Sequence, residues 1–215
     1  MFISFEGIDF SGKSTQITLL LRRLENASVE SLLVREPGGT EISERIRTLL
    51  LDPSHGNMDP VSEFLLFSAS RSQLVQDVIA PALRRRVLVI ADRFFDSSTA
   101  YQGYGRGLDL EALQRVHQLA THGISPDMTF FMDIPVAESF ARRPQRAGDT
   151  DRMENAGEDF YRRVRDGYLR LAAKFPARIL VIDGVRPAEE IAEQIWERIS
   201  AKLVSPTHDT EGEQA

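Results

Sequence analysis

The sequence predicts an α/β fold with a doubly wound, five-stranded parallel sheet flanked by helices and a short basic lid. Apolar, β-prone runs alternate with helical patterns along the chain. The runs 87–91 and 179–182 are apolar at every position, which is typical of parallel strands covered on both faces. A glycine-rich phosphate-binding pattern joins the first run to the first helical pattern.

The alternation gives the boundaries of each element. We expect strands at 2–6, 32–34, 87–91, 128–133 and 179–183. Helices are expected at about 13–26, 40–51, 61–85, 109–122, 158–174 and 187–203. Residues 1–204 contain no repeat or linker and are predicted to form one domain. Residues 205–215 are polar and aperiodic, which predicts a disordered tail.

The composition excludes several classes of protein. The chain has no cysteine, so disulfides and Cys-ligated metals are absent, and a reducing cytoplasm is the expected location. No apolar run reaches about 18 residues and no signal peptide is recognisable, so we expect no membrane partner. The net charge of −6 argues against a broad nucleic-acid surface.

The first loop carries the strongest functional signal. Residues 7–14 read G-x-x-x-x-G-K-S between a strand and a helix, the context that a phosphate-binding loop requires. Gly7 and Gly12 allow the backbone to curl around an anion, and the helix N-terminus offers N–H groups to phosphates. Lys13 is a cation for the β and γ phosphates, and the Ser14 hydroxyl can bind Mg²⁺. Asp9, within the loop, could accept from a sugar hydroxyl, act on Mg²⁺ through water, or be solvated.

Basic residues follow the second strand. Arg35 begins a Pro- and Gly-containing loop, and Thr40 is placed to cap the next helix, which carries Arg47. Arg35 and Arg47 could both reach an anion over the sheet. A solvated helix face is the equal alternative for Arg47, because charges of both signs surround it.

Phe67 and Arg71 lie one turn apart on a predicted helix and therefore share a face. Core packing would explain Phe67, but an arginine on such a face needs an acceptor. An aromatic ring beside a planar donor suits a nucleobase, with stacking on the ring and a carbonyl bound by the guanidinium.

Asp92 and Arg93 end the third strand, where ligand sites of α/β proteins form. Asp92 could hold Mg²⁺ through water and Arg93 could bind phosphate, or the two could simply form an ion pair. Residues 96–105 follow, with the hydroxyls, amide and aromatic rings that read a neutral base and a sugar.

A basic segment at 142–157, interrupted by Gly and Pro, has the composition of a lid that closes over phosphates and supplies an arginine to the transition state. A solvated basic loop is the alternative.

Taken together, these segments resemble the thymidylate kinase family over about residues 1–203. The resemblance lies in residues 5–9 and 12–16, the Arg-Glu-Pro-Gly-Gly-Thr segment at 35–40, residues 66–71, the Asp-Arg-Phe segment at 92–94 with Ser-Ser-Thr-Ala-Tyr-Gln at 97–102, and residues 151–154. It implies transfer of the ATP γ-phosphoryl group to dTMP for dTTP synthesis, with Mg²⁺ as cofactor, and a homodimer.

The resemblance also implies roles for individual residues. ATP would bind the loop formed by Gly7, Ile8, Asp9, Phe10, Ser11, Gly12, Lys13, Ser14 and Thr15. Asp9 would contact the sugar 3′-hydroxyl, Phe67 would stack on thymine, and Arg71 would reach its O4. Further substrate contacts would come from Arg35, Arg47, Arg93, Ser98, Tyr101 and Gln102, with Tyr101 crowding a ribose 2′-hydroxyl.

In this family a catalytic arginine lies either in the phosphate-binding loop or in the lid. Because Phe10 occupies the loop position, the lid has to supply the arginine. Arg146 is the first choice, beside Lys13, Arg93 and Asp9 as the other catalytic residues; its rivals are Arg142, Arg143 and Arg152.

Two other readings stay open at this stage. Another pyrimidine nucleotide or nucleoside kinase would share the loop, although Arg71 favours a base carbonyl and so thymine or uracil over cytosine. A non-catalytic nucleotide-binding switch is the second, although the guanine-reading N-K-x-D pattern of GTPases is absent from the sequence.

Overall fold

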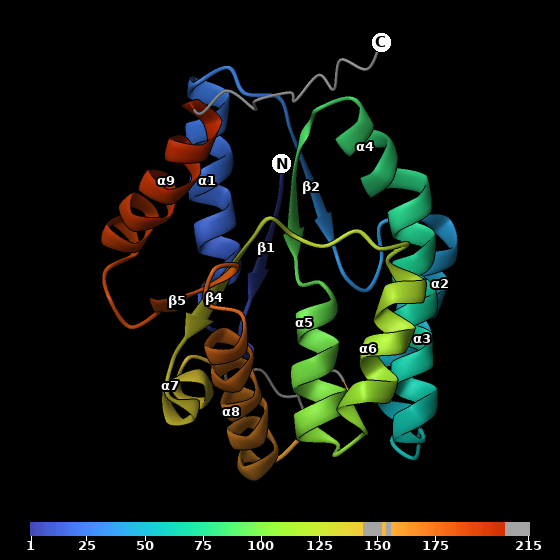
Figure 1. The fold of residues 1–215 in the computed structure, drawn as a ribbon. Coiled ribbons are helices and arrows are strands. Elements are labelled where there is room, and N and C mark those ends of the chain that lie inside the picture. Colours follow the sequence, from blue (N-terminus) through green and yellow to red (C-terminus); the bar gives the residue numbers. More distant parts are fainter. Residues whose placement is uncertain (144–151, 154–155, 205–215) are drawn as a thin grey trace.

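The centre of the molecule is a parallel sheet of five strands (Figure 1), in a computed structural model that describes residues 1–143, 152–153 and 156–204. The strands lie in the order β2-β3-β1-β4-β5. Their bounds are β1 Phe2–Glu6, β2 Ser31–Arg35, β3 Leu88–Asp92, β4 Met128–Asp133 and β5 Ile179–Asp183. Each predicted strand is confirmed within one residue at either end.

Helical segments connect the strands and cover both faces. Their bounds are α1 Lys13–Asn26, α2 Glu41–Leu51, α3 Pro60–Leu74, α4 Ala80–Arg84, α5 Phe95–Ser98, α6 Leu110–Ala120, α7 Val136–Ala141, α8 Glu158–Lys174 and α9 Ala188–Val204. A 3₁₀ turn, η1, spans Pro53–His55, and π-helical segments η2 and η3 span Val75–Ile79 and Thr99–Gly105. Thr40 caps α2 as predicted, because its hydroxyl accepts from the backbone N–H of Ser43 (3.2 Å).

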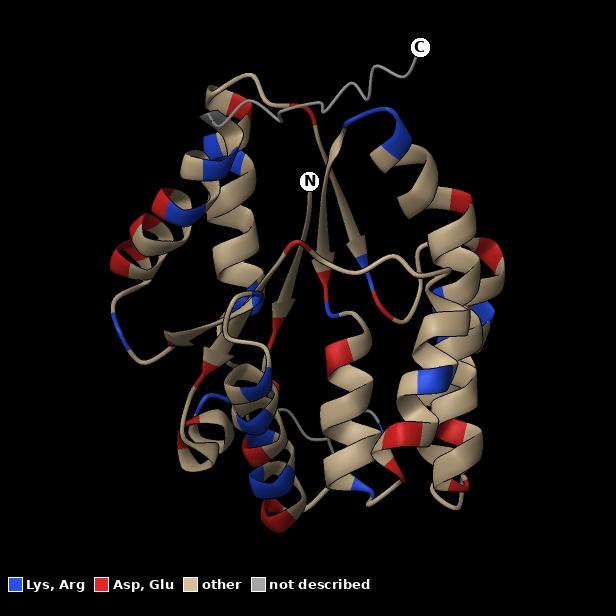
Figure 2. Cartoon of the chain, in the orientation of Figure 1, with Lys and Arg blue, Asp and Glu red and all other residues tan. Residues whose placement is uncertain are grey.

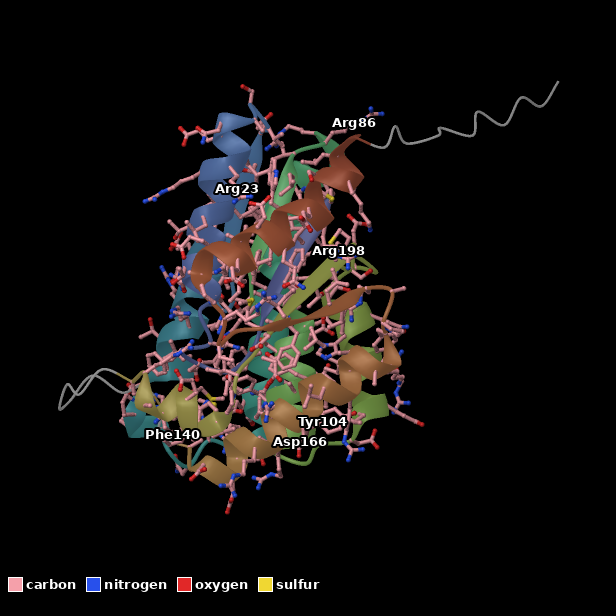
Figure 3. All side chains as sticks on the ribbon, turned by 90° about the vertical axis from the view of Figure 1, so that its left-hand side faces the viewer. Arg23, Arg86, Tyr104, Phe140, Asp166 and Arg198 are labelled. Atoms are coloured by element: carbon pink, nitrogen blue, oxygen red, sulfur yellow. The ribbon has the colours of Figure 1, made fainter. Side chains whose placement is uncertain are left out.

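The two faces of the sheet bury different side chains of the same strands. Ile3 and Phe5 of β1 pack in a cluster with α1 and α9, whereas Phe2 packs with η2 and α4 on the other side. Apolar residues at successive positions are therefore all buried, which explains the lack of alternation in the sequence. Arg23 of α1, labelled in Figure 3, donates to Glu193 of α9 (2.6 Å) and ties the two covering helices together.

Two helical stretches depart from the predicted pattern. The segment expected as one helix at 61–85 is α3, η2 and α4 in succession. Residues 95–105, expected as a polar base-reading segment, are helical as α5 and η3. The helix at 95–105 gives no amphipathic signal because η3 is buried almost throughout, and a Cβ at Gly105 would lie 2.7 Å from Phe160 of α8. A Cβ at Gly167 of α8 would likewise lie 2.7 Å from Tyr104, labelled in Figure 3, so η3 and α8 pack tightly.

Charged residues gather where the strands end (Figure 2). Glu6, Asp92 and Asp133 are the last residues of β1, β3 and β4, and Arg93 follows β3. Because all strands are parallel, these side chains share one edge of the sheet, where the first loop and η3 also lie. Within the described residues, no helix is both long and apolar enough to cross a membrane. The predicted tail at 205–215 lies outside the described residues.

Candidate active site

The loop between β1 and α1 has a backbone that needs glycine. Gly7 has φ 142°, and a Cβ there would lie 2.7 Å from the carbonyl oxygen of Met132. Gly12 has φ 94° and immediately precedes α1. The first N–H groups of α1 and the positive end of its dipole therefore lie at the end of the loop, as anion binding requires. Phe10 is also left-handed, with φ 59°, so its backbone is held in a conformation that non-glycine residues rarely adopt.

Lys13, the first residue of α1, lies against this loop. It is buried, and its ammonium donates to the carbonyl oxygens of Gly7 (3.2 Å) and Ile8 (3.0 Å). Burial and the positive charge of Arg93 lower the pKa of Lys13 from 10.5 to about 8. The ammonium still carries its proton at neutral pH, so Lys13 presents a fixed positive charge at the loop.

An open cleft of about 500 Å³, here called the loop cleft, lies over these residues. Its lining includes these residues predicted to bind ATP and metal: Asp9, Phe10, Ser11, Gly12, Lys13, Ser14, Thr15 and Asp92. Arg93 and Arg142 line it as well, whereas Gly7 and Ile8, also predicted to bind ATP, do not. Arg142 reaches the cleft from the end of α7 and donates to the carbonyl oxygens of Gly184 (3.2 Å) and Phe10 (3.5 Å). Three cations therefore border the loop cleft, which favours a polyanionic ligand.

A second cavity of about 240 Å³, the inner cavity, adjoins the first. It is lined by Asp9, Glu36, Pro37, Arg47, Leu51, Phe67, Arg71, Arg93, Phe94, Ser97, Ser98, Tyr101, Gln102 and Met153. Asp9 and Arg93 line both spaces. A ligand in the loop cleft and one in the inner cavity would thus meet at this pair of residues.

Asp9 and Arg93 form an ion pair of 2.6 Å. Arg93 also donates to the carbonyl oxygen of Gly7 (2.8 Å), and Tyr161 donates its hydroxyl to Asp9 (2.6 Å). Burial disfavours the charged form of Asp9, but the positive charges of Arg93 and Lys13 outweigh it and lower the pKa of Asp9 below 3.8. Asp9 is therefore a carboxylate at neutral pH, held in place from two sides.

The wall of the inner cavity that α3 supplies carries Phe67 and Arg71. Arg71 is 1% exposed; its Nε donates to Glu36 (2.8 Å) and its Nη2 donates to Ser98 (3.0 Å). Its Nη1 and the Oε1 of Glu36 have no hydrogen-bond partner among the described residues. A buried guanidinium nitrogen without an acceptor is costly, so this wall is suited to a planar ligand that brings a carbonyl oxygen.

Tyr101 and Gln102 of η3 form another part of the inner cavity. The Tyr101 ring lies 5.1 Å from the Arg93 guanidinium, and its hydroxyl accepts from Arg93 (3.3 Å). Gln102 donates to Glu63 (2.8 Å), which also pairs with the buried Arg152 at 2.5 Å. Arg152 lines neither space, so in this structure it supports the wall from behind.

The structure separates the two other predicted arginines. Arg47 lines the inner cavity and donates to the carbonyl oxygen of Pro37 (3.0 Å). Arg35 lies outside both spaces and forms a bidentate pair with Glu44 (3.0 and 2.9 Å). Arg146 lies outside the described residues, as does most of the predicted lid at 142–157.

Sequence reasoning did not single out Glu6, Tyr161 or Met153 as site residues. Tyr161 lies near the start of α8 at a position that fits the core, and nothing nearby in the sequence points to Asp9. Met153 lines the inner cavity from beyond the basic segment. Glu6 does have a signal, since an acidic residue ends an otherwise apolar strand immediately before the loop.

Comparison with known proteins gives a consistent family. The protein-family model described as "Thymidylate kinase" matches residues 5–195 of this chain. A thymidylate kinase of Kosmotoga olearia is 50% identical over 91% of this chain and 93% of its own. One of Chlorobaculum tepidum is 48% identical over 94% of this chain and 97% of its own. The crystal structure of a thymidylate kinase from Ehrlichia chaffeensis superposes with a TM-score of 0.75 at 36% identity, covering 93% of this chain and 98% of that one.

Proposed function

Since the chain belongs to the thymidylate kinase family, we propose which of its residues carry the family's reaction. The chain transfers the γ-phosphoryl group of ATP to dTMP and forms ADP and dTDP, the step that leads to dTTP. The assignment of residues rests above all on one observation, that Asp9 and Arg93 line both the loop cleft and the inner cavity. Phosphoryl transfer needs donor and acceptor in line, and this pair is where they would meet.

The donor belongs in the loop cleft. Residues 9–15, which line the loop cleft, surround the phosphates of ATP, with Lys13 beside the β and γ phosphates. The positive charge of Lys13 neutralises charge that develops on the transferred group. Because Lys13 is held by the loop carbonyls before any ligand binds, little reorganisation is needed during the reaction.

The acceptor belongs in the inner cavity. Phe67 stacks on thymine and Arg71 donates to its O4, which would satisfy the unpaired Nη1. Ser98 and Gln102 line the base, and Tyr101 lies beside the sugar where it excludes a 2′-hydroxyl. Asp9, already ionised, accepts from the sugar 3′-hydroxyl.

The acceptor phosphate lies between Arg93 and Arg47, both of which line the inner cavity. A phosphate monoester is largely ionised near neutral pH, so no strong general base is required. The arginines reduce repulsion between the two phosphates and orient the attacking oxygen. Arg35 pairs with Glu44, so its proposed role is only that of a more distant positive charge.

Mg²⁺ is the proposed cofactor. The hydroxyl of Ser14 and the carboxylate of Asp92 line the loop cleft beside Lys13, and hard oxygen ligands suit this ion. The described residues hold no group of three or more His, Cys, Asp or Glu that could bind a metal. In this proposal Ser14 and, through water, Asp92 hold the ion together with the phosphates of ATP. When bound, Mg²⁺ neutralises phosphate charge.

An arginine from the lid completes the proposed catalytic set. Arg146 remains the first choice and lies outside the described residues. Among its rivals, Arg142 lines the loop cleft, whereas Arg152 pairs with Glu63 behind the inner cavity. The contacts of Arg142 with the phosphate-binding loop favour it over Arg143 and Arg152 as a second arginine for the phosphates.

A homodimer and a cytoplasmic location are also proposed. Exposed large apolar side chains lie on the helices α2, α3 and α6, which Figure 1 draws next to one another: Ile42, Leu49, Val61, Leu65, Leu110 and Leu119. Others, such as Leu33 and Val181, lie elsewhere on the molecule. An apolar surface of this kind suits a second copy of the chain. Sedimentation of the purified protein would test this proposal.

The acceptor preference tests the assignment of the inner cavity. ADP release from ATP and Mg²⁺ is measured with dTMP, dUMP, dCMP, thymidine or no acceptor. Turnover that strongly favours dTMP, with dUMP next and dCMP far behind, supports the thymine site at Phe67 and Arg71. Preference for dCMP would contradict it, because the 4-amino group of cytosine is a donor and cannot accept from Arg71.

A further inference from the structure

Arg93 has a backbone conformation that needs support from its neighbours. Its φ is 71°, in the left-handed region that residues with a Cβ rarely occupy. The backbone N–H of Arg93 is held by the carbonyl oxygen of Phe5 (3.0 Å). This bond fixes where the turn begins. It does not hold the backbone after Arg93. The direction of the guanidinium depends on that following segment as well.

Glu6 holds that following segment at two points. The residue is fully buried. Its Oε1 accepts from the backbone N–H of Phe94 (2.7 Å), and its Oε2 accepts from the hydroxyl of Ser97 (2.5 Å). The Ser97 oxygen in turn accepts from Nη1 of Arg93 (3.2 Å). Glu6 therefore reaches Arg93 both through the adjacent peptide and through a side chain that touches the guanidinium.

Glu6 connects the two segments that carry the site. Glu6 ends β1 next to Gly7, so one carboxylate links the phosphate-binding loop to the turn after β3. Arg93 spans the same junction, because it donates to the Gly7 carbonyl (2.8 Å) and to Asp9 (2.6 Å). The remaining contact of Glu6 comes from α8, where Tyr168 donates to Oε2 (2.9 Å). Tyr168 lies outside both ligand spaces.

We propose that Glu6 is a positioning residue for the phosphoryl transfer, which acts by fixing Arg93 between the donor and acceptor phosphates. The inference rests on the proposed role of Arg93. Glu6 itself touches neither the loop cleft nor the inner cavity and transfers no proton to the substrate.

The test compares Glu6→Gln with Tyr168→Phe. Glutamine keeps the shape but has one accepting oxygen, so the Phe94 N–H and the Ser97 hydroxyl cannot both donate to it as they do to Glu6. Tyr168→Phe removes a hydroxyl that donates to the same carboxylate and lies 2.8 Å from the Ser97 oxygen, but it leaves the bonds of Glu6 to Phe94 and Ser97 in place. We expect kcat/KM for dTMP to fall about tenfold or more in Glu6→Gln, and to stay within about threefold in Tyr168→Phe.

Calorimetry separates positioning from general damage to the fold. In Glu6→Gln, affinity for dTMP should fall about tenfold, while affinities for ATP and for thymidine, which lacks the phosphate, stay within about twofold. Ser97→Ala, which leaves Glu6 and Phe94 in place, should show the same pattern more weakly. Equal losses for dTMP, thymidine and ATP would overturn the inference, as would a Glu6→Gln enzyme with wild-type kinetics.

A double-mutant cycle links the effect to Arg93. If Glu6 acts through Arg93, then Glu6→Gln costs less than about twofold when it is introduced into Arg93→Ala. A full tenfold loss in that background would show that Glu6 acts elsewhere. The two proposals also fail differently: normal turnover in Arg93→Ala removes the role of Arg93, whereas a defective Arg93→Ala with normal Glu6→Gln and Ser97→Ala removes only the role of Glu6.

Discussion

The Nη2 atom of Arg93 lies 2.6 Å from Oδ1 of Asp9, and both residues line the loop cleft and the inner cavity. Asp9 comes from the loop after β1 and Arg93 from the turn after β3, and these strands are neighbours in the sheet. The left-handed turn at Arg93 brings the arginine across to the loop. The fold therefore fixes a charged pair where the proposed donor and acceptor meet.

Phe67→Ala should raise the KM for dTMP about tenfold and leave the KM for ATP unchanged, because in the proposed site the ring stacks on the acceptor base and lies outside the loop cleft. Steady-state kinetics with each substrate varied in turn would measure both constants. Phe64→Leu is the matched control, since Phe64 lies one turn earlier on α3 and is buried in the core. Equal rises of both KM values in Phe67→Ala would place Phe67 in the core instead.

Arg152→Ala should lower the free energy of unfolding by about 1–3 kcal/mol, because the buried carboxylate of Glu63 loses a charged donor but keeps Gln102 and Arg106. Urea unfolding followed by circular dichroism measures this loss. Arg162→Ala, which removes an exposed pair with Glu158 on α8, should cost about 0.5 kcal/mol or less. An Arg152→Ala protein of normal stability but low kcat would instead identify Arg152 as the lid arginine that acts in catalysis.

Glu6 should make the stability of the protein depend on pH. Burial, followed by the negative charge of Asp96, raises the pKa of Glu6 from 4.5 to about 7 in the folded chain. Between these values the folded state binds more protons than the unfolded state, so this contribution is complete below pH 4.5 and is lost as the pH rises through 7. The free energy of unfolding of Glu6→Gln should lack that fall.

Urea unfolding of both proteins at pH 5, 6 and 7 provides the comparison. His117 contributes a slope of opposite sign, because burial lowers its pKa from 6.5 to about 3. That slope is common to wild type and Glu6→Gln and cancels in their difference. If the free energies of unfolding of wild type and Glu6→Gln differed by the same amount from pH 5 to 7, Glu6 would titrate at its ordinary pKa.

Much of the fold could be predicted from the sequence because its signals are local. Continuous apolar runs marked the strands, and Thr40 marked the start of α2. The short α5 and the π-helical η3 were missed, since a segment buried on every side has no polar face to give a helical period. Neither η1 nor α7 was among the predicted helices.

Site residues could likewise be predicted only where their sequence signals are local. Residues in recognisable motifs, such as Lys13, Phe67 and Arg71, line the spaces expected of them. Tyr161 contacts Asp9 across 152 positions of the sequence, and such a contact follows only from the packing of α8 beside η3. The pairing of Arg35 with Glu44 likewise depends on how the loop after β2 meets α2.

Arg93→Ala tests the central claim, that Arg93 joins the donor and acceptor sites. We expect kcat/KM for dTMP to fall by about 100-fold or more, because a charge that stabilises the transition state is lost. Calorimetric affinity for ATP should change by less than about threefold, since Lys13 and the loop remain. Near-normal turnover in a correctly folded Arg93→Ala enzyme would contradict the claim.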